Sequence, residues 1–230
     1  GQGGIFNGSS SFINTTYTIP AISTYSLSLW FKTSITGIRQ YLFADFNSSA
    51  NTSSPRLTLA IAANNNFQFY LGNGSSNWTD SSSASALSYL DGNWHNLVLV
   101  INGTSVKLYA DGNTTPIADL TSTVSAGTAG TSPVSIGRIG DYPLLYFNGS
   151  IDQVRIFPTS LSSSNVSLLY AETSATSSTL NYPVTATALY ELSGNANDTG
   201  NTYNGTATNV LYAYNGTATN VTYGNGRFNE

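Results

Sequence analysis

The chain has 230 residues and carries few charges: 8% of its residues are charged, and its formal net charge is −4. Two Lys and five Arg are too few to follow a phosphate backbone, so we expect no nucleic-acid partner. The absence of Cys excludes disulfides and thiolate metal sites. Without an apolar run of about 18 residues, we expect no membrane span.

Ser, Thr and Asn take the place of charged residues, with 33, 29 and 25 copies respectively. They form fourteen Asn-X-Ser/Thr sequons, about twice the number that random placement gives. Six of them read Asn-Gly-Ser/Thr, which tight turns alone would produce, so sugar-free turns remain an alternative to N-glycosylation. An uncharged, hydroxyl-rich surface indicates an extracellular or cell-surface location. The expected glycosylation sites are Asn7, Asn14, Asn47, Asn51, Asn73, Asn77, Asn102, Asn113, Asn148, Asn165, Asn197, Asn204, Asn215 and Asn220.

Most of the chain has the pattern of β-strands. Apolar and polar residues alternate over 26–32, 56–62 and 67–72, which predicts half-buried strands. The segment 96–101 is apolar on both faces, as in a central strand that is covered on both sides. Asn102-Gly103 and Asp111-Gly112 favour tight hairpin turns at the two ends of a strand over 106–110. One short helix with a Ser cap is expected over 162–171. This sequence of elements predicts an all-β sandwich.

Four segments also carry a resemblance to a known family. They are LSLWFKTS (27–34), LDGNWHNLVLVINGTSVKLYADG (90–112), SIGRIG (135–140) and FNGSIDQVRIFPTSLSSSNVSLLY (147–170). In order and spacing they resemble the laminin-G-like branch of the concanavalin A-like sandwiches, over about residues 5–171. The resemblance implies a two-sheet antiparallel jelly roll with one short helix. For function it implies sugar binding, adhesion or structural spacing.

The resemblance also raises the question of catalysis, because glucanases of this fold use two Glu on one strand. The chain has three Glu, Glu172, Glu191 and Glu230, and none lies within the sandwich body. Its single His, His95, follows Trp94 in a pair that the family carries as a structural feature. The sequence therefore predicts that the protein is not an enzyme.

For three residues of these segments we predict a structural role. Trp30 and Trp94 are expected in the core. Asp152 shares the strand parity of Val154 and Ile156, so we expect its side chain to face inward and to bind backbone amides.

Family members often hold Ca²⁺ at the rim of the sandwich with oxygen ligands, so Ca²⁺ is the one candidate cofactor. Asp45 and Asn47, in LFADFNSS, and Asp141, in IGDYP, are the expected candidates. The alternative is that each of these side chains caps its own turn.

Sugar binding would require exposed aromatic rings that stack on pyranose faces. Trp78, in SSNWTD, and Tyr142 and Tyr146, in DYPLLY, stand in loop-like contexts that suit this role. The alternative is that these rings pack against the rim of the sandwich.

The C-terminal part of the chain contains an exact repeat. The octet YNGTATNV occurs at 203–210 and again at 214–221. It lies in a segment, 188–230, that follows a Ser/Thr-rich linker (172–187) and resembles the opening strands of a laminin-G-like domain. The body, 1–171, lacks those strands. The repeat adds eleven residues, an odd number that changes strand parity, so it favours a loop or an added strand.

Three arrangements of this tail are compatible with the sequence. The tail can fold back on its own body, the chain can be one repeat of a tandem array, or the tail can complete the next subunit. We expect the third, because an open sheet edge is a template for an incoming strand. The residues expected to be buried in the neighbouring subunit are Leu189, Tyr190, Leu192 and Phe228.

The expected function is therefore that of an extracellular, N-glycosylated structural subunit, a homopolymer that forms a filament or surface assembly by strand donation. The alternative is a carbohydrate-binding adhesion module, one repeat of a larger cell-surface or virion-fibre protein, with glycans as partners.

Overall fold

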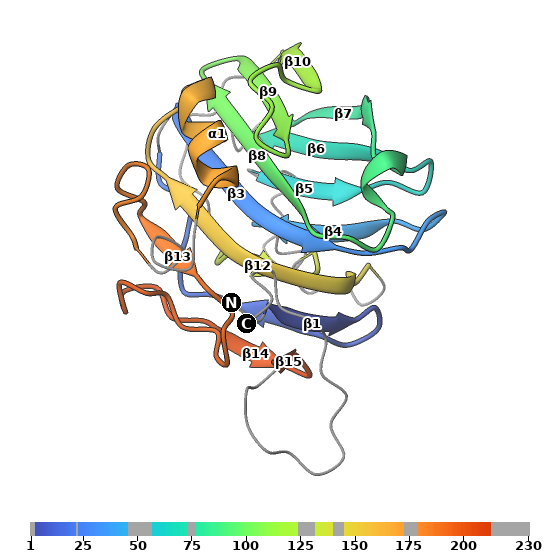
Figure 1. Ribbon diagram of the computed structural model, residues 1–230, viewed down its shortest axis with the longest axis vertical. Coiled ribbons are helices and arrows are strands. Elements are labelled where there is room, and N and C mark those ends of the chain that lie inside the picture. Colours follow the sequence, from blue (N-terminus) through green and yellow to red (C-terminus); the bar gives the residue numbers. More distant parts are fainter. Residues whose placement is uncertain are drawn as a thin grey trace.

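The computed structural model describes residues 3–21, 23–45, 57–72, 77–123, 132–139, 145–172 and 179–212, with the backbone alone described for 77–83. Within these ranges the strands form two antiparallel sheets that pack face to face, one of eight strands and one of seven (Figure 1). A short helix, α1 (Ser163–Tyr170), lies on the outer face of the eight-stranded sheet. The predicted all-β jelly-roll sandwich is confirmed.

We call the eight-stranded sheet the front sheet and the other the back sheet. The front sheet has the spatial order β10 (Ala118–Thr121), β9 (Ser105–Ala110), β8 (His95–Asn102), β3 (Thr24–Lys32), β12 (Asn148–Phe157), β1 (Gly4–Asn7) and β15 (Leu211–Tyr212), and β13 (Ala188–Tyr190) also pairs with β12. The back sheet has the order β14 (Thr206–Thr208), β2 (Phe12–Asn14), β11 (Ser135–Ile136), β4 (Gln40–Ala44), β5 (Leu57–Ile61), β6 (Asn66–Gly72) and β7 (Asn77–Ser85). A 3₁₀ turn, η2 (Leu87–Tyr89), precedes β8.

The core lies between the inner faces of the two sheets. On β3, Leu27, Leu29 and Phe31 alternate into it, each at most 1% exposed. The neighbouring strand β8 is apolar on both sides: Leu99 faces the core, whereas Val98 packs under α1 with the residues of the helix. This confirms the prediction of a central strand that is covered on both faces.

The helix is fixed at both of its ends. Ser162 and Asn165 form a capping box, in which the Ser162 Oγ accepts the Asn165 amide at 3.2 Å and the Asn165 Oδ1 accepts the Ser162 amide at 3.2 Å. Just beyond the helix, the buried Glu172 carboxylate pairs with the buried guanidinium of Arg155 on β12 at 2.5 Å.

Among the described residues, no helix has the length and apolar character needed to cross a membrane.

A bulge in β12 changes the expected orientation of Asp152. The pairing of β12 with β3 shifts register after Asp152, and Gln153 has a φ of 51°. Asp152 lies opposite Trp30, whose ring stacks on Tyr170 of α1 at 5.4 Å on the outer face of the sheet. The expected inward orientation of Asp152 is therefore wrong. The extra residue in the bulge shifts the alternation of the strand, so Asp152 and Val154 face opposite sides of the sheet and only Val154 lies in the core. Its Oδ1 accepts a backbone amide, that of Gln153, at 2.8 Å, as expected.

The two Trp residues expected in the core differ from that expectation. Trp30 is buried, but it lies under α1 rather than between the sheets, and Trp94 is only half-buried.

The tail returns to its own body along three strands. β12 is long enough for two partners on one edge: β1 pairs with residues 148–151, and β13 pairs with residues 154–156. β14 pairs with β2 at the edge of the back sheet, and β15 pairs with β1 at the edge of the front sheet. In Figure 1 the orange and red tail strands lie beside the yellow β12 and the dark blue β1.

This closure corrects the expectation that the tail serves a neighbouring subunit. Leu189, Tyr190 and Leu192 are buried to 0%, 0% and 1% exposure in the core of their own chain. Pairing within one chain fills the open edges without the entropy cost of association, which strand donation would incur. Phe228 lies outside the described residues.

Candidate functional site

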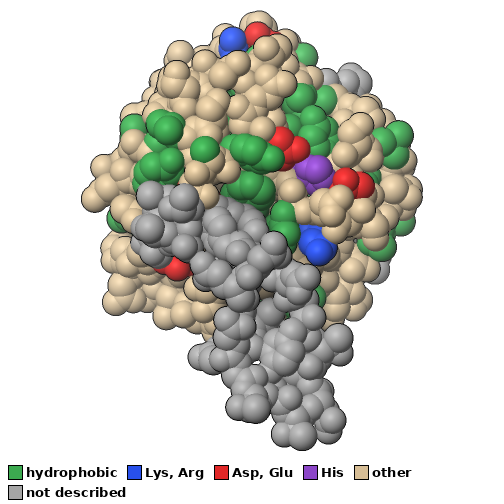
Figure 2. Space-filling view, in the orientation of Figure 1, with side chains coloured by type: hydrophobic (Ala, Val, Ile, Leu, Met, Phe, Trp, Pro, Cys, Tyr) green, Lys and Arg blue, Asp and Glu red, His purple; other side chains and the backbone are tan. Residues whose placement is uncertain are grey.

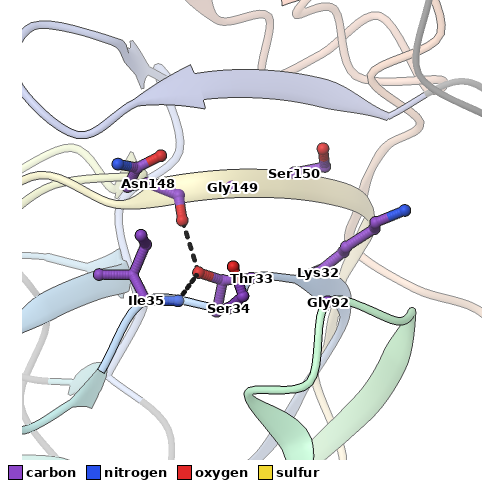
Figure 3. A pocket seen from close by; sticks show the side chains of 8 residues that line it. All are labelled: Lys32, Thr33, Ser34, Ile35, Gly92, Asn148, Gly149 and Ser150. Atoms are coloured by element: carbon purple, nitrogen blue, oxygen red, sulfur yellow. Dashed lines mark hydrogen bonds between the residues drawn. The ribbon is translucent and has the colours of Figure 1, made fainter.

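A pocket opens at the rim of the sandwich, where β3 ends and β12 begins (Figure 3). Its volume is about 320 Å³. Three separate segments build it: the end of β3 with the loop that follows, the turn before β8, and the start of β12. The lining residues are Lys32, Thr33, Ser34, Ile35, Gly92, Asn148, Gly149 and Ser150.

Gly149 and Thr33 hold this rim together. Gly149 has a φ of 150°, and a Cβ there would lie 2.2 Å from the carbonyl oxygen of Lys32, so only Gly allows β12 to approach β3 so closely. The Thr33 Oγ1 donates to the Asn148 carbonyl at 2.7 Å and accepts the Ile35 amide at 3.1 Å. Both bonds are drawn in Figure 3, and together they fix the loop after β3 against the start of β12.

The lining offers hydrogen-bonding groups of several kinds. Its described residues include Lys32 with an ammonium, Ser34 and Ser150 with hydroxyls, and Asn148 with a side-chain amide, and none of these described residues carries a carboxylate. Ser34 is exposed, and the other three are half-buried. Within the described part of the chain, Lys32 takes part in none of the four salt bridges. The pocket therefore combines neutral donors and acceptors with one positive charge, which suits a polar ligand with many hydroxyls.

The single His lies at the same end of the front sheet as the pocket, and both of its ring nitrogens have hydrogen-bond partners. The His95 Nδ1 lies 2.8 Å from Asp111 Oδ2, and its Nε2 lies 3.0 Å from Asp91 Oδ1. Figure 2 shows the purple imidazole flanked by red carboxylates on this face. With both ring nitrogens hydrogen-bonded, the imidazole has no free lone pair for a general base. It ties the turn before β8 to the turn after β9, which is a structural role.

The electrostatics of this cluster follow from the same bonds. The hydrogen bond to Asp111 raises the pKa of His95 above its usual value, burial opposes this rise, and the bond to Asp91 adds to it. Hydrogen bonds from the backbone and side chain of Asn93, and then from His95, lower the pKa of Asp91 to about 2. The imidazole is thus held toward its charged form between two carboxylates.

Of the three predicted sugar-binding residues, Tyr146 alone has a described side chain, and it is not among the residues that line the pocket. Tyr146 is half-buried, and its ring lies 6.4 Å from that of Phe12 on β2. The Arg138 guanidinium lies over the same Phe12 ring at 3.4 Å. Tyr146 therefore packs at the rim, as in the alternative that we considered for it. The side chain of Trp78 and all of Tyr142 lie outside the described residues.

The predicted calcium ligands are not brought together in the described part of the chain. Asp45 is buried, and its Oδ1 accepts the Leu57 amide at 2.7 Å, so it closes the connection between β4 and β5. Asn47 and Asp141 lie outside the described residues. Within the described ranges, no three His, Cys, Asp or Glu side chains gather into a group that could hold a metal ion. Calcium binding stays a prediction.

The sequons divide by exposure. The exposed ones are Asn7, Asn14, Asn102, Asn113 and Asn197, and the half-buried ones are Asn148, Asn165 and Asn204. The side chain of Asn77, and Asn47, Asn51, Asn73, Asn215 and Asn220 altogether, lie outside the described residues. Asn148 is special because it is one of the residues that line the pocket, and Asn165 because its side chain serves in the cap of α1.

The chain also matches a known family model. The family model described as the concanavalin A-like lectin/glucanases superfamily matches residues 7–167, so the chain belongs to this superfamily. This confirms the resemblance that the sequence segments carry. No curated protein sequence matches the chain.

Solved structures with the same fold are distant in sequence. A candidate carbohydrate-binding protein from Bacteroides ovatus has a TM-score of 0.68 at 14% identity, over 92% of this chain and 59% of that one. The CBM40 of a Ruminococcus gnavus sialidase has a TM-score of 0.53 at 18% identity, over 70% and 96%. Mouse laminin α1 domains LG4-5 have a TM-score of 0.51 at 21% identity, over 71% and 43%. The chain thus spans about 59% of the Bacteroides protein's length.

Sequence reasoning did not find the pocket residues Lys32, Ser34, Asn148 and Ser150 as a group. The available signal was the Gly149 that directly precedes Ser150 and Ile151 in a strand. A Gly inside a strand indicates a close approach of another backbone, and here the approaching backbone is that of Lys32.

Proposed function

We propose that the chain is a carbohydrate-binding module of an extracellular protein and that the rim pocket holds the sugar. One observation carries the proposal: the pocket lining brings one ammonium, two Ser hydroxyls and one Asn amide together at the edge of a lectin-type sandwich. Sugar hydroxyls both donate and accept hydrogen bonds, so a lining of this composition matches them. The carbohydrate-binding neighbours in fold support the same class of ligand.

Binding is a better proposal than hydrolysis. A glycosidase of the common type needs two carboxyl groups on either side of the scissile bond, and the described lining residues have none. Glu172 is committed to Arg155, and the Glu191 Oε1 accepts the Thr199 hydroxyl at 2.7 Å. Neither Glu is among the lining residues.

We do not propose that the tail forms a filament by strand donation. That expectation rested on an open sheet edge in the body, and the edges of β12, β2 and β1 that the tail covers are paired with β13, β14 and β15 of the same chain. Adhesion through a bound sugar needs no such exchange.

The test is a glycan array of neutral and acidic oligosaccharides, probed with the fluorescently labelled chain and followed by titration of each glycan bound. The two Lys provide a matched pair, because Lys107 is paired with Asp119 at 3.2 Å on β9, away from the pocket. Loss of a hydrogen bond to a charged group costs about 1.5–3 kcal/mol, so Lys32→Gln should raise Kd at least about tenfold. Lys107→Gln should leave Kd unchanged. An array without bound glycan, or equal effects of the two substitutions, would contradict the proposal.

N-glycosylation of the exposed sequons belongs to the same proposal of an extracellular module. Asn102 is exposed at the turn between β8 and β9, whereas Asn148 lines the pocket. Because Asn148 belongs to the pocket lining, a glycan attached to it should hinder ligand binding. Glycopeptide mapping of the native protein should therefore find sugar on Asn102 and none on Asn148. A native mass equal to the 24.3 kDa of the bare chain would contradict glycosylation but not sugar binding.

A further inference from the structure

The first copy of the repeated octet fills a defined place in the fold, which we call the octet slot. The slot consists of the edge of β2 with its flanks (11–17), Ala196, and the start of β1 (4–5). Thr206, Ala207 and Thr208 of β14 pair with β2, and Leu211 and Tyr212 of β15 pair with β1. The ten residues 203–212 therefore connect the edges of the two sheets.

The first half of the octet is held by contacts that depend on residue type. The Tyr203 ring meets that of Tyr17 edge-on at 5.0 Å, and its carbonyl accepts the Tyr190 hydroxyl at 2.7 Å. The Gly205 amide donates to the Ala196 carbonyl at 3.0 Å. A Cβ on Gly205 would lie 2.7 Å from Ile13 Cγ2 and 2.8 Å from the Ala196 oxygen, so this position accepts only Gly.

The second half is equally specific. Asn209 has a φ of 51°, a conformation that Asn tolerates better than most residues, and its carbonyl accepts the Ser11 hydroxyl at 2.5 Å. Val210 packs against the core beside Gly4. Leu211 is a large apolar side chain that is 67% exposed, so the slot does not require it.

The repeat in the sequence matches these requirements position by position. Residues 214–223 read YNGTATNVTY, against YNGTATNVLY at 203–212. Nine of the ten positions are identical, and the one that differs has Thr222 in place of Leu211. The single difference thus falls on a side chain that the slot leaves exposed. Every residue type that the slot requires, including the Gly and the Asn, recurs eleven positions later.

We propose that residues 214–223 are a second occupant of the octet slot and that the same chain can place either copy there. Residues 213–230 lie outside the described residues, so the second occupant is inferred from its residue types, with which the two occupants can make the same contacts with β2, β1 and Ala196. They differ in that the second leaves residues 203–213 as a loop, whose entropic cost grows only slowly with length. The first copy is therefore favoured and the second remains accessible, so the edge of the sandwich stays covered when the first copy is lost.

The first experiment uses the absence of Cys from the chain. Asn14 and Thr206 lie directly opposite each other in the β2–β14 pair, at a separation that a disulfide can bridge. Thr217 is the counterpart of Thr206 in the second copy. In a glutathione redox buffer, Asn14→Cys with Thr217→Cys should form a disulfide within the monomer, and Asn14→Cys with Thr206→Cys is the positive control. Peptide mapping identifies the bond.

The matched control for this bond is Gly216→Val, which adds to the second copy the Cβ that the slot excludes. It should reduce the disulfide between positions 14 and 217 several-fold and leave the disulfide between positions 14 and 206 unchanged. The proposal is overturned if the bond to position 217 fails to form while the positive control is complete. It is also overturned if the bond survives Gly216→Val, or if it forms only between two chains.

The second experiment measures thermal stability of the full chain. If the second copy replaces the first, Gly205→Val should lower Tm by only a few degrees and Gly216→Val should not change it. The double variant should lose much more than the sum of the two, or fail to fold. A Gly205→Val chain that is as unstable as the double variant would overturn the proposal, because no second occupant would then be protecting the edge.

Discussion

The body of the sandwich and its tail are held by different kinds of contact. In the body, β3 and β8 bury large apolar side chains between the sheets, and β8 buries more beneath α1. The tail strands β13, β14 and β15 have only two or three residues each. They depend on backbone pairing, on a few core side chains such as Tyr190, and on single polar residues such as the buried Asp198, which accepts the Leu189 amide at 2.9 Å. The stability of the body is spread over many side chains, whereas that of the tail depends on a few positions.

The match to the family model also covers less of the chain than the sandwich does. The family model ends at residue 167, but strands continue to Tyr212 and close both sheets. The structural match to the Bacteroides protein leaves out 8% of this chain, which is fewer residues than the tail, 188–230, contains. Part of the tail therefore shares that fold, although the match to the family model ends before the tail begins.

The largest effect should come from removing the tail. Deletion of 188–230 takes three strands from three sheet edges and exposes core side chains such as Leu192. Each buried side chain of this kind contributes about 1.5–3 kcal/mol, against a total of about 5–15 kcal/mol for a domain. We expect the shortened chain to lose its cooperative unfolding transition in calorimetry. Deletion of 213–230 alone is the control, since it leaves β13, β14 and β15 in place. If both deletions melted like the full chain, the tail would not be part of the fold.

The next effect tests the connection between body and tail. Glu172→Gln leaves the Arg155 guanidinium buried beside a neutral side chain, and breaking a buried pair in this way costs about 3–5 kcal/mol. Urea unfolding should report this loss in the free energy of unfolding. The double change Arg155→Met with Glu172→Leu should recover most of it, because neither charge is then left unpaired. A double variant as unstable as Glu172→Gln would contradict this explanation.

A matched pair of Leu residues sharpens the comparison within the tail itself. Leu192 is 1% exposed and Leu211 is 67% exposed. Leu192→Ala should cost about 2–5 kcal/mol through lost burial and the cavity that it leaves. Leu211→Ala should change the free energy of unfolding by less than about 0.5 kcal/mol. Equal losses in urea unfolding would indicate that the tail does not pack as described.

The smallest effect concerns pH and belongs to the body. The pKa of His95 is raised in the folded state, so its contribution to stability is present below the unfolded pKa of about 6.5 and is lost as pH rises through the folded pKa. Tm should therefore fall slightly between about pH 6 and pH 8.5, and His95→Gln should remove this slope. The pKa of Asp91 is lowered to about 2, so its contribution is lost only as pH falls below about 4. An unchanged slope in His95→Gln would assign the effect to other groups.

Local patterns predicted the body well for physical reasons that are visible in single segments. Period-two alternation predicted β3, and Asn102-Gly103 predicted the tight turn between β8 and β9, where Gly103 has a φ of 60°. The Ser cap predicted the start of α1. Each of these signals lies within a few residues of the element that it specifies.

The remaining features depend on contacts between distant segments. The bulge at Gln153 is one residue long and leaves the hydrophobic pattern of β12 almost unchanged, so the orientation of Asp152 was predicted wrongly. The pocket joins Lys32, Gly92 and Asn148, which come together only through the pairing of β3 with β12 and the fold of the turn before β8. The choice between closure in one chain and exchange between chains depends on the path of the linker, for which the sequence has no local signal.

The pairing of β1 with β15 has a mechanical consequence for a module that is held by a surface. Gly4 lies opposite Tyr212 in an antiparallel pair. A tension applied at residues 3 and 212 therefore pulls the two strands apart from their adjoining ends, and their hydrogen bonds break one after another instead of sharing the load. Under force, the module should yield first at this seam, while β3 and β12, which frame the pocket on the far side of β1, keep their pairing.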